Sequence, residues 1–147
     1  MIVITDSNVF ISALISPRGS VASIFKSKSK IQFFAPDFIF IEINNHLDKI
    51  RRSSHLSRKV FDIEYAFLKT RVKLIKVNTI PRKYLEESEE IVSGIDRDDF
   101  GFVALGRYKK CRIWTGDKVL INGLLKKGYD MCITTSELKN KLYKKGK

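Results

Sequence analysis

Short apolar segments alternate along this chain with longer segments in which apolar residues recur every three or four positions. The short segments are rich in β-branched and aromatic residues, which is typical of buried strands. They predict strands at residues 2–5, 31–35, 72–77, 111–115 and 131–134. Each is too short for a helix, and a helical pattern separates it from the next.

The longer segments predict amphipathic helices. We expect them at residues 7–14, 20–28, 37–52, 57–70, 81–94, 98–105, 118–126 and 136–142. In the 37–52 helix, the expected core side is Ile39, Ile43, Leu47 and Ile50. In the 57–70 helix, the apolar positions are Val60, Ile63, Phe67 and Leu68.

Strands that alternate with helices in this way predict an α/β protein with a parallel sheet covered by helices on both faces. The chain is long enough for one such domain, which we place at residues 1–147. In open parallel sheets, ligands bind beyond the carboxyl ends of the strands. Functional residues are therefore expected directly after strands.

The charge balance changes the picture, because Lys and Arg number 28 against 16 Asp and Glu, a formal net charge of +12. Such a surface attracts polyanions, and nucleic acid is the commonest of these. A basic patch of Arg51, Arg52, Arg58 and Lys59 is a candidate for contact with the RNA backbone. A plain solvated surface is the alternative for the patch and for the charge as a whole.

Other features suggest a cytoplasmic protein. No run approaches the roughly 18 apolar residues of a membrane span, so we expect no membrane association. The segment 1–6 has no basic residues and ends in a carboxylate, unlike a signal peptide. Cys111 and Cys132 sit in apolar runs, which favours free buried thiols.

Aspartates follow two of the predicted strands. Asp6 follows the first strand and Asp117 follows the fourth, each one or two residues after a threonine and at the start of a helix. An aspartate there often serves only as a helix N-cap. Two of them at equivalent strand ends suggest a shared site.

Further acids stand in unusual surroundings. Glu42 lies among five apolar residues in the segment 38–43, where an ionised carboxylate is costly unless a cation or hydrogen-bond donors compensate it. A solvent-facing position or a salt bridge to His46 or Lys49 is the alternative. Asp96, Asp98 and Asp99 crowd the start of another helix, and capping accounts for only one of them.

Together these carboxylates could form an acidic pocket at one end of the sheet, with Asp6, Glu42, Asp96, Asp99 and Asp117 as candidate metal ligands. Such a pocket calls for hard cations, Mg²⁺ or Mn²⁺, which take oxygen ligands. An acidic metal pocket within a basic surface is the arrangement that a metal-dependent nuclease needs.

Four segments in this order resemble those of PIN-domain ribonucleases, a family that includes the toxins of VapBC-type toxin–antitoxin pairs. They are residues 4–14, Glu42 in its helix, residues 96–105 and residues 114–117. The resemblance spans essentially the whole chain. It implies a three-layer α/β/α sandwich with a central parallel sheet of four to five strands.

The resemblance also implies roles for individual residues. Asp6, Glu42, Asp99 and Asp117 would be the metal-binding acids that carry out RNA hydrolysis, with Asp96 as an additional acid. Asn8 and Thr115 would support them as polar neighbours that orient ligands. The register of the third acid stays open between Asp96 and Asp99, with the spacing to the following apolar run favouring Asp99.

Several alternatives stay open at this point. The same fold could be a non-catalytic nucleic-acid-binding module. A phosphoryl-transfer domain with a nucleophilic aspartate after the first strand is disfavoured, because Asn8 stands where one such class needs a second aspartate and Thr5 where another needs an acid. The resemblance implies RNA as substrate, homodimer formation, and an antitoxin partner if the chain is a toxin.

Overall fold

The computed structural model describes residues 1–144 of the chain. Its sheet consists of β1 (Ile2–Thr5), β2 (Gln32–Pro36), β3 (Val72–Ile75), β4 (Arg112–Trp114) and β5 (Cys132–Ile133). All neighbouring strands are parallel, in the order β3-β2-β1-β4-β5. The parallel sheet predicted from the apolar segments is confirmed.

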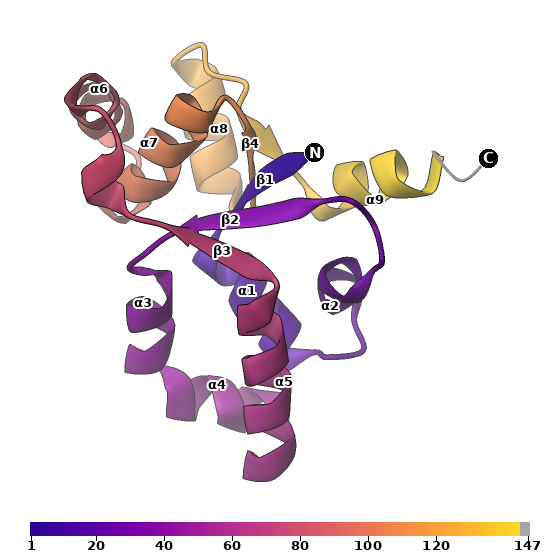
Figure 1. The fold of residues 1–147 in the computed structure, drawn as a ribbon. Helices are drawn as coiled ribbons and strands as arrows, with labels where there is room; N and C mark the ends of the chain where they lie inside the picture. The colour runs from indigo at the N-terminus through magenta and orange to yellow at the C-terminus, as the bar shows by residue number, and fades with distance from the viewer. Residues whose placement is uncertain (145–147) are drawn as a thin grey trace.

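Helices cover both faces of this sheet and form the predicted three-layer α/β/α sandwich (Figure 1). On one face lie α1 (Ser7–Ile15), α2 (Ser20–Lys26), α3 (Ile39–Asn45), α4 (Leu47–Ser54) and α5 (Arg58–Thr70). On the other lie α6 (Arg82–Val92), α7 (Phe100–Lys109) and α8 (Lys118–Lys126). The 3₁₀ turns η1 (Val77–Thr79) and η2 (Arg97–Asp99) precede α6 and α7, and α9 (Thr135–Lys144) follows β5 beside α2.

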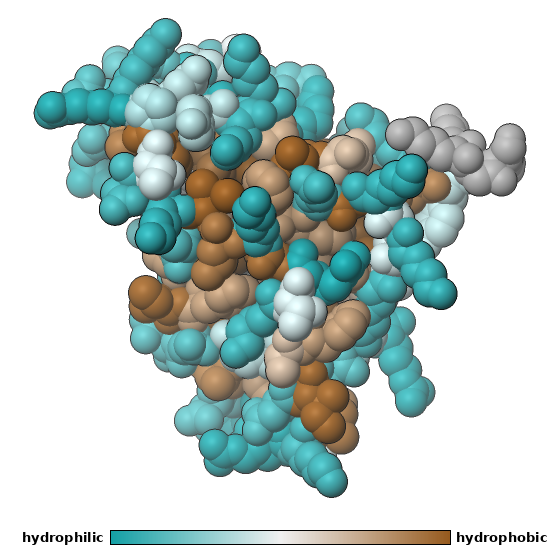
Figure 2. All heavy atoms as spheres, viewed as in Figure 1, coloured by the Kyte–Doolittle hydropathy of each residue, from teal (hydrophilic) through white to brown (hydrophobic). Residues whose placement is uncertain are grey.

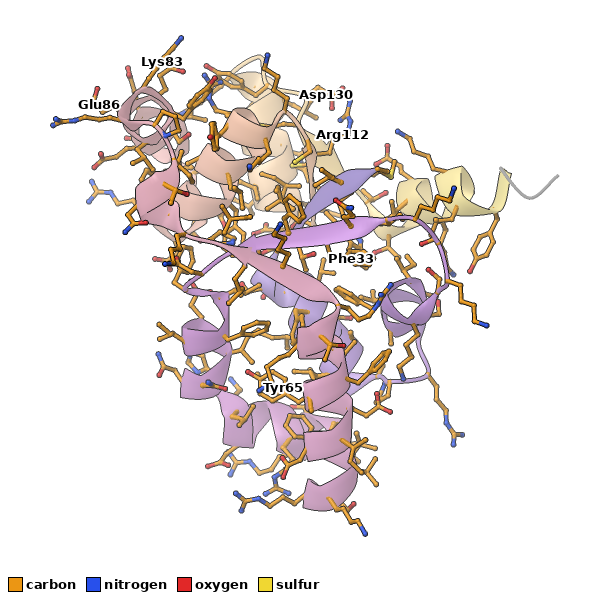
Figure 3. The ribbon with its side chains drawn as sticks, viewed as in Figure 1. Phe33, Tyr65, Lys83, Glu86, Arg112 and Asp130 are labelled. Carbon is orange, nitrogen blue, oxygen red and sulfur yellow. The ribbon has the colours of Figure 1, made fainter. Side chains whose placement is uncertain are left out.

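An aromatic cluster fills the layer between the sheet and α1, α2 and α5. Phe33 on β2 packs against Phe25 and Trp114, with ring centroids 4.8 and 5.7 Å away. Trp114 is fully buried, and its indole N–H donates to the Thr135 hydroxyl at 3.0 Å. Figure 3 places Phe33 on the sheet and Tyr65 on the helix below it. These contacts join β2, β4 and α2 on this face of the sheet.

Two helix predictions need correction. The single helix predicted at 37–52 is broken at His46, whose φ of −122° and ψ of 19° separate α3 from α4. In α5 the buried residues are Phe61, Tyr65 and Leu68. Three of the four apolar residues named from the sequence are exposed instead: Val60, Ile63 and Phe67. The core side of α5 is set by Phe61 and Tyr65, which pack on each other with ring centroids 6.2 Å apart, and Tyr65 also packs against Phe10 of α1.

Helix α7 contains two glycines, Gly101 in its first turn and Gly106 further along. A Cβ atom on Gly101 would lie 2.5 Å from the Phe38 ring, and one on Gly106 would lie 3.2 Å from the Cys111 carbonyl oxygen. The glycines therefore permit a close approach to neighbouring segments, which outweighs their low helix propensity.

No single helix in residues 1–144 has the length and apolar composition of a membrane span. The pair α1 and α2, bent by 101°, reaches them only when its two helices are taken together. Most of the apolar residues of this pair are buried in the core.

Candidate active site

The strand order reverses between β1 and β4, which makes their carboxyl ends the expected ligand site of this sheet. A hollow of about 430 Å³ lies there. Residues from the start of α1, from α3, from η2 and α7, and from the start of α8 line it. Its acids are Asp6, Glu42, Asp96, Asp98, Asp99 and Asp117. The structure thus brings all five predicted acids into one hollow.

Asp6 is held where β1 meets β4. Its backbone N–H donates to the Trp114 carbonyl at 3.2 Å, and its Oδ2 accepts from the Thr115 hydroxyl at 2.7 Å. Asp6 is only 4% exposed, and its side chain makes no capping hydrogen bond to α1. Burial raises its pKa, with a smaller contribution from Asp117, while the Thr115 hydrogen bond lowers it. The backbone N–H groups of Asn8 and Ser7 also lower this pKa, but the short hydrogen bond of the carboxylate is to Thr115. Capping of α1 alone therefore does not explain Asp6.

Asp99 is the second buried acid, 9% exposed at the start of α7. Its side chain does not cap α7, and its Oδ2 is buried with no hydrogen-bond partner among residues 1–144. Burial raises the pKa of Asp99 to about 7, assisted by repulsion from Asp6, Asp96 and Asp117. A buried carboxylate oxygen that accepts no hydrogen bond is costly. This oxygen is therefore suited to bind a cation.

Two of the acids do act as helix caps. Asp117 Oδ1 accepts from the N–H groups of Val119 and Leu120 at 3.0 and 3.3 Å. Asp96 Oδ1 accepts from the N–H of Asp98 at 2.9 Å. In both cases the second carboxylate oxygen stays available at the hollow. Asp99, unlike Asp96, has no structural hydrogen bond to explain it, which favours Asp99 as the third acid.

Glu42 faces the same hollow from α3 and is half-buried. Burial raises its pKa most, and the charges of Asp98 and Asp6 add to that, while the Ser7 hydroxyl and His46 lower it. Neither His46 nor Lys49 forms a salt bridge with Glu42 within residues 1–144.

The donor types in this hollow fit a hard divalent cation, since they are carboxylate oxygens, one of them buried and unpartnered. In the described residues, however, no three His, Cys, Asp or Glu side chains are arranged to hold one metal ion directly. The acids share a hollow and raise one another's pKa without converging on a single point.

Polar neighbours hold the site together. The Thr115 hydroxyl donates to Asp6 and accepts from the backbone N–H of Asp117 at 3.0 Å, so it links the two strand ends. Asn8 is exposed at the rim. Thr115 therefore contacts two acids of the site, and Asn8 lines its hollow.

Three polar residues of the hollow were not predicted as site residues from the sequence. The Ser7 hydroxyl donates to Asp6 Oδ1 at 3.5 Å, and Asn45 and His46 line the hollow together with Glu42. Asn45 and His46 follow Glu42 by three and four positions, which is one turn of a helix. That spacing was a usable signal.

The predicted basic patch lies elsewhere. Arg51 and Arg52 are in α4, and Arg58 and Lys59 begin α5, at the end of the molecule away from the sheet (Figure 1). None of the four lines the acidic hollow. None of them forms a salt bridge within residues 1–144.

Comparison with known proteins agrees with this geometry. No curated protein shows significant similarity to the chain. The family model described as PIN domain matches residues 4–142. That match runs from β1 to α9 and contains every acid of the hollow. The PIN domain is a nuclease fold, and the chain belongs to the PIN-domain family.

Proposed function

We propose that this protein is a metal-dependent endoribonuclease that hydrolyses RNA phosphodiester bonds. The observation that supports this most is the cluster of acids at the switch point of the sheet, within a chain of net charge +12. Six acids line this hollow without any lysine or arginine of residues 1–144 lining it beside them, which suits cation binding. The surplus of lysine and arginine elsewhere suits a polyanion.

Asp6, Glu42, Asp99 and Asp117 would hold Mg²⁺ or Mn²⁺, with Asp96 as an additional acid. Bound there, the cation would supply a hydroxide from water and neutralise charge on the phosphate. Thr115 fixes the Asp6 carboxylate by its hydrogen bond. Asn8, exposed at the rim, can donate from its amide to an oxygen of the substrate. Arg51, Arg52, Arg58 and Lys59 would contact RNA far from the scissile bond.

We expect the purified protein to cleave single-stranded or structured RNA in Mg²⁺ or Mn²⁺ and to lose that activity in excess EDTA. Gel analysis of a labelled RNA, with the cation restored after chelation as the control, measures it. Cleavage that continues undiminished in EDTA contradicts the proposal. RNA binding without cleavage under any divalent cation favours the alternative, a non-catalytic nucleic-acid-binding module on the same fold.

We also propose that the protein forms a homodimer. Val60, Ile63 and Phe67 leave an apolar stripe exposed along α5, with exposed fractions of 44%, 60% and 43%. Figure 2 shows uncovered apolar atoms in the region of this helix. A stripe of this kind is typical of an interaction surface. We propose a further partner, an antitoxin protein, on the condition that the chain is a cytoplasmic toxin. A gene for a small protein directly upstream of the gene for this chain would support that role.

Light scattering tests the dimer. We expect a molar mass of twice the 17.0 kDa chain for the parent protein and a shift toward 17.0 kDa for Ile63→Lys. Leu125→Lys, at a similarly exposed apolar position on α8, is the matched control and should leave the mass unchanged. A parent protein that is monomeric at high concentration rules out the α5 interface.

A further inference from the structure

Two other hollows are lined by residues that neighbour the acids of the site in the chain, so each is a candidate path for a nucleic acid strand bound at the acids. One, of about 400 Å³, runs along α8 and begins at Ile95 and Lys118, each next in the chain to an acid of the site. The other, of about 630 Å³, lies along α6 and is lined by Arg97 and Phe100, which also neighbour acids of the site.

The two hollows carry opposite charge. Glu86, Glu89 and Glu90 line the hollow along α6, with Arg97 as its one lining cation. Figure 3 shows Glu86 projecting outward from that helix. The hollow along α8 is lined by Lys118, Lys126 and Lys127 and by no acid. A phosphate backbone is therefore repelled from α6 and attracted to α8.

The lysines of α8 differ in their freedom to bind a ligand. Lys127 Nζ donates to the carbonyls of Ile91 and Ser93 at 2.6 and 2.7 Å, so it fastens the end of α6 to α8. Lys118 and Lys126 are exposed and form no salt bridge in the part of the chain that the structure describes. Their ammonium groups are available for phosphates.

The polar residues of this groove are spaced for an extended strand. Lys118, Asn122 and Lys126 lie four positions apart and so share one face of α8. From Lys118 to Lys126 the helix rises about 12 Å. At roughly 3.4 Å per nucleotide in a stacked strand, that is the length of three to four nucleotides.

Two glycines line the groove and shape it. Gly94 has no heavy atom within 4 Å of the position its Cβ would take. Gly123 lets Ile95 pack on α8, because a Cβ there would lie 2.9 Å from the Ile95 side chain. Val119, 66% exposed, adds apolar surface against which bases can pack.

We propose that the groove between α8 and the Gly94–Ile95 segment binds the sugar–phosphate backbone of the RNA strand on one side of the scissile bond, with Lys118 and Lys126 on its phosphates. This inference rests on the proposed function and assigns the path of its substrate. Lys118 and Lys126 act there as positioning residues for the strand, while the acids of the neighbouring hollow carry the chemistry.

Two double variants test the path. K118Q/K126Q removes both lysines of the groove that form no salt bridge within residues 1–144, and K28Q/K30Q removes two lysines that are also exposed, between α2 and β2, as the matched control. Binding of a fluorescein-labelled 12-nucleotide RNA is followed by anisotropy without divalent cation at several salt concentrations. The slope of log affinity against log salt should fall by about 1.4 for K118Q/K126Q, about 0.7 for each lost phosphate contact, and stay unchanged for the control.

Two further measurements accompany the slopes. In Mn²⁺, K118Q/K126Q should raise the KM for this RNA about tenfold with little change in kcat. Photo-crosslinking of a 4-thiouridine RNA should label the peptide containing residues 118–126. Equal slopes for the two double variants, or crosslinks that avoid α8, overturn the path. A parent protein that binds this RNA but does not cleave it overturns the proposed function instead. In that case the salt slopes of binding still show whether the groove along α8 holds the RNA.

Discussion

Replacing Asp6 with asparagine is expected to reduce metal-dependent RNA cleavage by at least about 100-fold, since even indirect partners of metal ligands contribute 10- to 100-fold. The Asp6 carboxylate is buried at the strand switch and held by Thr115. Asparagine keeps the shape and the hydrogen bond to Thr115 and removes the charge. Initial rates of cleavage in saturating Mn²⁺ measure the loss.

The matched control is Asp37→Asn. Asp37 follows β2 as Asp6 follows β1, but it is exposed and lies outside the acidic hollow. Its replacement should leave cleavage within about twofold of the parent rate. The Asp6→Asn protein should still bind RNA without metal, and its melting temperature in EDTA should not fall. Equal cleavage by the two variants would remove Asp6 from the reaction.

The sequence predicted the sheet and its functional edge because both depend on local patterns. Five short apolar runs became five parallel strands, and the aspartates after β1 and β4 meet at the strand switch. Parallel connections of this type place consecutive strand ends on one edge, so the position of Asp6 and Asp117 followed from topology alone.

The sequence could not separate capping acids from free acids. Asp117 and Asp6 occupy equivalent positions, yet Asp117 bonds two N–H groups of α8 while Asp6 turns to Thr115, 109 residues further along the chain. That choice depends on how β4 packs against β1. The sequence also did not predict the break between α3 and α4 at His46, because the helical spacing of apolar residues continues across it from Ile43 to Ile50.

Helix α5 shows that an apolar pattern does not identify which face of a helix is buried. Apolar residues surround this helix on more than one face, and Phe61 and Tyr65 take the core side. Val60, Ile63 and Phe67 are left in solvent within the single chain. Periodicity alone cannot say which of two apolar faces meets the sheet and which meets a partner.

The stability of the protein should depend on pH because burial and the neighbouring carboxylates raise the pKa of Asp99. Its pKa is raised from 3.8 in the unfolded chain to about 7 in the fold. The folded state therefore binds the proton more tightly, so the stability contributed by the protonated form is fully present below about pH 4 and is lost as pH rises through 7. Without metal, Asp99→Asn avoids this loss.

We therefore expect Asp99→Asn to gain on the parent protein as pH rises from 5.5 to 8 in EDTA. The shift to about 7 implies a gain on the order of 2 kcal/mol over this range, at 1.36 kcal/mol per pH unit. That corresponds to about 5 °C in melting temperature for a domain of this size. Thermal melts of parent, Asp99→Asn and the exposed Asp37→Asn control measure it, and a gap that is constant with pH contradicts the raised pKa.

Adding Mn²⁺ at pH 8 should reverse the order of the two melts. A cation that binds only the folded state at 100 times its dissociation constant stabilises it by about 2.7 kcal/mol. The parent and Asp37→Asn should gain that stabilisation, and Asp99→Asn should lose most of it, because it has lost the buried oxygen that no hydrogen-bond donor reaches. If Asp99→Asn and the parent gain equally from Mn²⁺, Asp99 does not bind the cation, and Asp96 becomes the third acid of the site.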